Sequence, residues 1–220
     1  MAMAMRDVLC GTIFALLAFQ SGGVGATNYR LDPKETTSSF EVRLLGIIPV
    51  RGHFKHTTGG MRFDPASKVG NIEVLIDTTT VEANSARASA TARGPDFFNV
   101  EKYPRIEFKS SRFVFEGERL HLIEGMLTLT GNTQPVTLVI HHAVCKPTPA
   151  SIPATPAVCR AEATLTVKRS AFGMKSWPHS VGDDVTINIA MVAFAEADEI
   201  KPQLLPPTAA AATTELIKQP

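Results

Sequence analysis

The chain has 220 residues, of which 44% are hydrophobic and 20% charged, so it can bury one sizeable core and lacks the charge excess of a disordered chain. Its formal net charge of +1 offers no electrostatic attraction to nucleic acid or to anionic membrane surfaces. One globular domain without a nucleic-acid partner is therefore expected.

Residues 1–26 are typical of a secretory signal peptide. Arg6 precedes an apolar run, Ile13–Phe19, and small residues up to Ala26 predict cleavage after that residue. The run is well short of the roughly 20 residues that a membrane-spanning helix needs. We therefore expect a periplasmic protein with no stable membrane anchor after processing.

Residues 27–198 are expected to form a series of short β-strands. In the segment SFEVRLL, Phe40, Val42 and Leu44 share one face while Glu41 and Arg43 face the other way, a period of two residues. The same alternation recurs at Ile72, Val74 and Ile76, at Ile106 and Phe108, at Leu120 and Leu122, at Leu127 and Leu129, at Val136, Leu138 and Ile140, at Leu165 and Val167, and at Val185, Ile187 and Ile189.

Turn signals separate these runs at the spacing of hairpins. They are TTGG near Gly59, DPASKVG from Asp64, EGER near Gly117, TGNTQP near Gly131 and VGDD from Val181. Short, regularly spaced strands without long helices predict an all-β fold, an antiparallel barrel of about eight strands. The inward side chains of such a barrel either fill it or leave room for one ligand, and the strand pattern leaves both alternatives open.

One segment, residues 82–99, departs from the strand pattern. It is rich in Ala, Ser and Arg, which predicts a short helix capped near Asn84. The helix would lead directly into DFFNVEKYP, where two adjacent phenylalanines, Phe97 and Phe98, stand at the corner before the next strand. This corner is the feature from which the resemblance below begins.

The last third of the chain carries a cysteine pair and a distinct tail. In an exported chain Cys145 and Cys159 are expected to form a disulfide across the base of a proline-rich loop, which would stabilise the fold by about 3 kcal/mol. Residues 199–220 hold four prolines and an Ala/Thr tract, which predict a flexible tail.

Motifs for catalysis or metal binding were sought and not found in the sequence. There is no phosphate-binding glycine loop and no G-x-S-x-G segment. His141 and His142 are adjacent in a predicted strand, while His53 and His56 are three apart, and neither spacing suits chelation. We therefore expect no enzyme, no metal and no cofactor other than a bound lipid.

The segment DFFNVEKYPRIEFKS resembles the hallmark of the YceI-like family of exported proteins. FEVRLLG, VRGHF, IDTTTVEAN, GMLTLTGNTQPVTL, KRSAFGM and VGDDVTINI are similar to further segments of that family, over residues 28–197. The resemblance implies a lipocalin-like barrel that holds a long amphiphile, described as a polyisoprenoid or an isoprenoid quinone. It also supports the disulfide and implies a homodimer. A fatty acid or amide is the remaining ligand class.

The inward apolar positions are the expected ligand-binding residues. They are Val42, Leu44, Phe54, Ile72, Val74, Ile76, Phe108, Leu127, Leu129, Leu138 and Ile187. Of Phe97 and Phe98, one is expected to cap the barrel and the other to pack the helix against it. Arg93 is either a donor to a polar head group or a solvated helix charge.

Two departures from the family concern polar positions. The family's Arg-Asp-x-His-Leu-Arg-Ser run before the corner is replaced by ASATARG, in which only Arg93 matches, and a family histidine is Leu44 here. Head-group recognition is therefore expected to differ. Two other functions remain open: an enzyme or accessory factor of isoprenoid metabolism, and a stress or interaction protein with a filled barrel.

Overall fold

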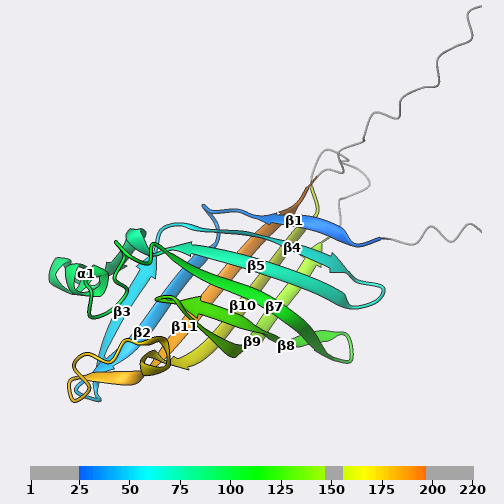
Figure 1. The fold of residues 1–220 in the computed structure, drawn as a ribbon. Helices are drawn as coiled ribbons and strands as arrows, with labels where there is room; N and C mark the ends of the chain where they lie inside the picture. Colours follow the sequence, from blue (N-terminus) through cyan, green and yellow to red (C-terminus); the bar gives the residue numbers. More distant parts are fainter. Residues whose placement is uncertain (1–24, 147–155, 197–220) are drawn as a thin grey trace, which may run out of the picture.

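The strands of the chain form one antiparallel sheet that closes on itself (Figure 1). The structure is a computed structural model, and it describes residues 25–146 and 156–196. The predicted signal peptide, except its last two residues, and the predicted tail from residue 199 lie outside the described residues. Within them the elements are β1 (Thr27–Leu31), β2 (Thr37–Leu44), β3 (Ile48–Phe54), β4 (Thr57–Asp64), β5 (Val69–Asp77), β6 (Val81–Ala83), α1 (Ala86–Arg93), β7 (Arg105–Glu116), β8 (Arg119–Leu129), β9 (Asn132–Lys146), β10 (Val158–Lys168) and β11 (Val181–Ala195).

The eleven strands form a barrel of eight strands, because three pairs of them each act as one interrupted strand. β1 and β2 both pair with β11, β1 also pairs with β4, and β2 also pairs with β3. β5 pairs with β4, and β6 pairs with β3. Thus β1 and β2 form one long interrupted strand, as do β3 and β4, and β5 and β6. Because β7 to β11 follow as consecutive hairpins and β11 returns to β1, the barrel is closed, as predicted.

Two of the predicted turns lie inside strands. Gly59 belongs to β4, with φ of +151°, and a Cβ there would collide with the backbone carbonyl of Glu73. The glycine therefore marks a close approach of two strands and not a turn. VGDD opens β11, where the register against β2 shifts between Val181 and Val185, so this segment is a β-bulge. The turns after Asp64 and near Gly117 and Gly131 are confirmed.

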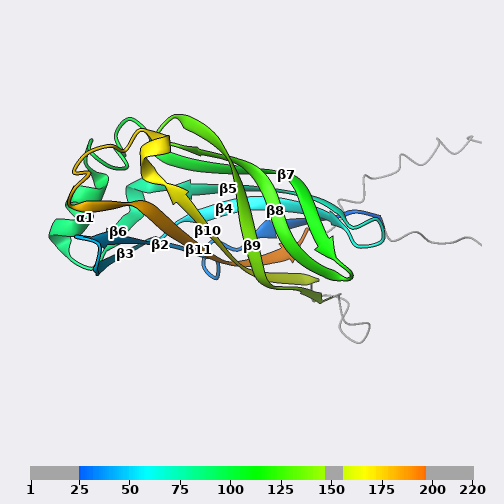
Figure 2. The ribbon, with the colours of Figure 1, turned by 90° about the horizontal axis from the view of Figure 1, so that it is seen from below.

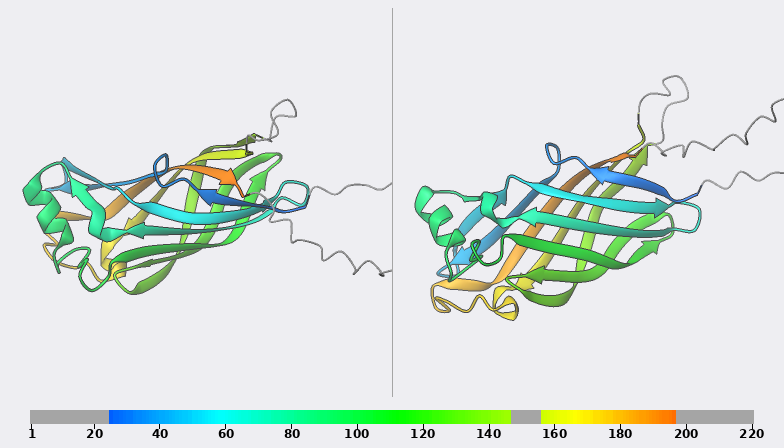
Figure 3. Two further views of the ribbon diagram at one scale, coloured as in Figure 1. Left: turned by 90° about the horizontal axis from the view of Figure 1, so that it is seen from above. Right: turned by 45° about the horizontal axis from the view of Figure 1, so that its top comes forward.

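The predicted helix is present as α1, and it lies at one end of the barrel (Figures 2 and 3). Its N-cap is Ser85, whose hydroxyl accepts a hydrogen bond from the Ala88 N–H, one residue later than the predicted cap at Asn84. In each view the helix is at the end opposite the turns of the β4–β5 and β7–β8 hairpins. It therefore stands over one mouth of the barrel.

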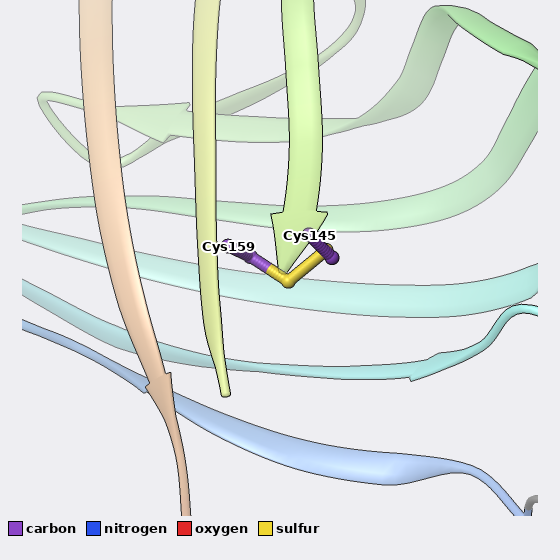
Figure 4. Close-up of a disulfide and its surroundings, with 2 residues drawn as sticks. All are labelled: Cys145 and Cys159. Atoms are coloured by element: carbon purple, nitrogen blue, oxygen red, sulfur yellow. A yellow bond between two sulfur atoms is a disulfide. The ribbon is translucent and has the colours of Figure 1, made fainter. Parts of the chain in front are cut away.

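The predicted disulfide closes the neighbouring strands at the opposite end (Figure 4). Cys145 of β9 and Cys159 of β10 are direct cross-strand partners, with their Cα atoms 4.0 Å apart. Residues 147–155 of the intervening segment lie outside the described residues. The bond thus fixes the last but one paired position of β9 and β10 at the mouth opposite α1.

Candidate functional site

The interior of the barrel contains two apolar cavities, one toward each end. One has a volume of about 330 Å³ and is walled partly by α1, and we call it the helix-end cavity. The other, of about 310 Å³, is walled partly by Cys145 and Cys159, and we call it the disulfide-end cavity. Both volumes lie at the lower end of the roughly 300–1,000 Å³ that is usual for small-molecule sites. The barrel is therefore not completely filled by its own side chains.

Most of the predicted ligand-binding residues line one of these cavities. Those at the helix-end cavity are Val42, Leu44, Phe54, Ile76, Phe97, Phe98, Leu127, Leu129 and Ile187. Those at the disulfide-end cavity are Ile72, Val74, Phe108 and Leu138. The alternation of the strands thus places eleven of the fourteen positions on the inside, the corner after α1 adds Phe97 and Phe98, and the exception is Arg93.

The two cavities meet at the middle of the barrel. Ile189 of β11 contributes to the walls of both. Its cross-strand partners are Ala163 and Ser38, and the Ser38 hydroxyl accepts a hydrogen bond from the Thr57 hydroxyl at 2.9 Å. Ser38 and Thr57 are both fully buried. A short layer of packed side chains, and not a second sheet or a loop, therefore separates the two spaces.

Phe97 and Phe98 take different neighbours. The Phe98 ring packs edge-on against Phe40 and Phe54, with ring centroids 5.4 Å apart in both pairs. Phe97 instead packs against Trp177, with ring centroids 6.0 Å apart, and its ring centroid lies 5.9 Å from the guanidinium carbon of Arg169. Phe98 thus belongs to the barrel packing, whereas Phe97 connects the corner to the segment before β11.

The predicted head-group donor, Arg93, is not among the residues that line the two cavities. Its Nη2 donates a hydrogen bond to the carbonyl oxygen of Val81 at 2.5 Å, and this contact ties α1 to β6. Its assignment to ligand binding stays a prediction. Among the described residues the arginines that do line the helix-end cavity are Arg87 and Arg169.

Arg169 is the buried cation of the helix-end cavity, with only 3% of the residue exposed. Its guanidinium donates to four backbone carbonyls, those of Gly182, Met174, Ser176 and Val181, at 2.7–2.9 Å. These bonds hold the segment between β10 and β11 against the barrel. A guanidinium suits this task because its five N–H groups form a rigid, planar fork.

Asp183 lies beside this arginine and accepts hydrogen bonds from Ser170. The Ser170 backbone N–H binds it at 2.9 Å and the hydroxyl at 2.8 Å, which together hold the pKa of Asp183 below its usual range. Because the folded-state pKa is below the unfolded value, the carboxylate stabilises the fold above about pH 4, and this contribution is lost as the pH falls through the folded-state pKa.

The variant Asp183→Asn should therefore be less stable than the wild type at neutral pH, by up to about 1 kcal/mol because the site is partly solvated. The difference should shrink as the pH falls below about 4, and urea unfolding at about pH 7 and about pH 3 can measure the change. Asp184→Asn is the matched control, since Asp184 forms an exposed pair with Lys168 at 3.0 Å. An equal difference at both pH values would contradict the assignment.

Several cavity residues were missed by the sequence analysis. Phe40, Ile140, Leu165 and Val167 share the faces that the alternation had marked, so the pattern contained them. Arg169 and Trp177 carried no such signal, because both lie between strands. In residues 25–146 and 156–196, no helix is long and apolar enough to span a membrane. The same residues contain no group of three potential metal ligands.

Comparison with known proteins finds one domain along most of the chain. The sequence model of the YceI-like domain matches residues 29–193. Protein YceI of Escherichia coli O157:H7 is 36% identical over 137 residues, which cover 61% of this chain and 71% of the relative. Protein YceI of Salmonella agona is 35% identical over the same shares of both chains.

Two solved structures share the fold. The crystal structure of Burkholderia cenocepacia BcnA has a TM-score of 0.61 at 23% identity and covers 74% of this chain and 98% of its own. A polyisoprenoid binding domain from Saccharophagus degradans, implicated in plant cell wall breakdown, has a TM-score of 0.54 at 13% identity and covers 76% and 98%. At these identities the likeness shows the fold alone.

Proposed function

Since the chain belongs to the YceI-like family, we propose that its barrel binds a long amphiphile, a polyisoprenoid or an isoprenoid quinone, for transport, storage or stress protection. The Saccharophagus degradans neighbour is described as a polyisoprenoid binding domain, which supports this ligand class. The predicted signal peptide supports a periplasmic location for this function.

The observation that carries the proposal is the pair of apolar cavities inside one closed barrel. They lie end to end, share Ile189, and are lined mainly by aliphatic and aromatic side chains. A ligand made of repeated hydrocarbon units would extend from one cavity to the other if the side chains between them moved aside. A short ligand would need only one cavity, so the arrangement favours a long one.

The free energy of burying a long hydrocarbon tail predicts low selectivity for tail length. Burying about 40 carbons at ~0.8 kcal/mol per methylene would contribute ~30 kcal/mol. Measured affinities saturate near ~20 kcal/mol, so the ordering of a flexible tail must offset much of this gain. We therefore expect the barrel to accept a range of tail lengths.

The direct test is native mass spectrometry of the purified protein followed by organic extraction. We expect co-purified isoprenoid lipids with several tail lengths. Ala163→Phe should reduce the amount of bound lipid, because Ala163 is buried and lines the disulfide-end cavity. Ala190→Phe is the matched control, since Ala190 is exposed on the adjacent strand β11.

Two results would count against the proposal. One is a folded protein that yields no lipid and takes up none from added isoprenoids. The other is equal lipid retention by the Ala163→Phe and Ala190→Phe variants, which would show that the lipid sits elsewhere. A sharp preference for one tail length would contradict only the expectation of low selectivity.

A further inference from the structure

We propose that the protein docks on an anionic phospholipid bilayer through an apolar rim beside the helix-end cavity, formed by Leu45, Ile47, Ile48 and Trp177. The proposal rests on the proposed function in one respect: the rim would give a lipid a path between the bilayer and the barrel. The docking itself can be measured without any bound lipid.

The rim is made by two segments that are held together. The β2–β3 hairpin supplies Leu45, Ile47 and Ile48, which are 62%, 76% and 48% exposed. The segment before β11 supplies Trp177, which is 51% exposed. The Leu45 N–H donates to the Ser180 carbonyl at 2.7 Å, so the two segments lie side by side. Four of the largest exposed hydrophobic side chains thus gather at one mouth of the barrel.

Two of these side chains lie on an unusual backbone conformation. Leu45 has φ of 52° and Trp177 has φ of 56°, in the left-handed region. Glycine or asparagine adopts this region more readily, whereas bulky side chains are strained when they are held there. Two large, exposed, apolar residues at such positions point to a role beyond packing, and insertion into an apolar medium supplies one.

Charge around the rim selects an anionic partner. Residues 42–51 and 173–182 contain Arg43, Arg51 and Lys175 but no carboxylate of their own, and one carboxylate from outside them, that of Asp96, accepts a hydrogen bond from the Ser176 hydroxyl at 2.7 Å. Arg51 is paired with Glu41 of β2 at 2.7 Å, while Arg43 and Lys175 form no ion pair with the described residues. Arg87, also without such a pair, lies on the cavity wall nearby. The nearly neutral chain therefore carries a local positive charge where its apolar side chains are exposed.

This combination fits a bilayer better than a second copy of the chain. Basic residues attract anionic head groups, and apolar side chains enter the acyl boundary beneath them. A two-fold contact between copies would instead place the same cations against one another. The rim is also continuous with the cavity, because Leu44, Val50 and Trp177 line it. A lipid tail leaving a bilayer at the rim would therefore meet an apolar surface.

Trp177 provides the probe, since it is the only tryptophan of the chain. The full chain is mixed with vesicles of phosphatidylethanolamine and phosphatidylglycerol, and its emission is compared with that in vesicles of phosphatidylcholine alone. We expect a blue shift and quenching by brominated acyl chains in the anionic vesicles only. Because the signal comes from Trp177 itself, membrane binding by the N-terminal segment alone would not produce it.

The variant Leu45→Asn/Ile47→Ser should weaken the vesicle affinity measured by this shift at least about tenfold, because two exposed aliphatic side chains are lost. Asparagine is well tolerated at the φ of residue 45, so the fold should be retained. Val69→Ser is the matched control, since Val69 is 66% exposed at the start of β5, away from the rim. It should leave the shift unchanged.

Three results would overturn the docking proposal: no shift with anionic vesicles, an equal shift for the Leu45→Asn/Ile47→Ser variant, or a blue shift that depends on protein concentration without vesicles. The last would assign the rim to a contact between copies. A protein that carries lipid but shows no shift would support the proposed function and contradict the docking. A protein that shows the shift but carries no lipid would support the docking and contradict the proposed function.

Discussion

Replacing Arg169 by methionine should lower the free energy of unfolding by about 3–4 kcal/mol, because four buried or partly buried carbonyls lose their donor at once. Methionine restores part of the apolar volume, so the loss comes mainly from the hydrogen bonds. Part of it is recovered where carbonyls such as that of Ser176 reach water. Guanidinium chloride unfolding of both proteins measures the difference.

The same variant should also release the segment between β10 and β11. The carbonyls of Met174 and Ser176, on either side of Lys175, are held by Arg169. Without these bonds, acrylamide should quench Trp177 more strongly. Arg160→Met is the matched control, because Arg160 is half exposed on β10 and forms only a long ion pair of 3.7 Å with Glu35. If both variants lost the same stability, the hydrogen bonds of Arg169 would not be what holds the segment between β10 and β11.

The strands could be predicted because their side chains alternate, and the places where prediction failed are irregularities of backbone. In β8 the sequence pattern grouped Leu120 with Leu122. In the structure Leu120 and Ile123 line the disulfide-end cavity, because the register between β7 and β8 shifts between Val114 and Phe115. A bulge reverses the faces beyond it, and nothing in a period of two reveals one in advance.

The glycines show a related limit. Gly59 looked like part of a turn, yet its role is to let β4 approach the carbonyl of Glu73. At Gly52 a Cβ would overlap the ring of Phe40, which lies directly across the strand pair. Such glycines make room for a partner that is distant in sequence. Sequence alone distinguishes them poorly from turn glycines, because both lack a side chain for opposite reasons.

The apolar residues that line the cavities could be predicted from the sequence, but the polar contacts there could not. An inward apolar position follows from the alternation of side chains along a strand, so residues such as Leu127 and Ile187 were found. The polar contact of an arginine depends on which carbonyls the fold brings near it. Arg93, chosen by resemblance, donates to the carbonyl of Val81 and lines neither cavity, whereas Arg169 was not singled out and is the buried cation.

Replacing Phe98 by alanine should destabilise the protein by about 3 kcal/mol, near the lower end for a large aromatic side chain because Phe98 is only partly buried. The loss removes the edge-on contacts with Phe40 and Phe54, by which the corner after α1 packs onto the barrel. The helix stands over the mouth of the helix-end cavity. Lipid retention, measured as extracted lipid per protein, should therefore fall together with stability.

Phe97→Ala is the matched control, because Phe97 is adjacent in sequence but contacts Trp177 and Arg169 instead. It should shift the emission of Trp177 while leaving most of the bound lipid in place. Replacing Phe98 tests whether the corner holds the ligand or only the fold. If a folded Phe98→Ala variant retained as much lipid as the wild type, the double phenylalanine would be a packing device for α1, and the cavity would be closed by other residues.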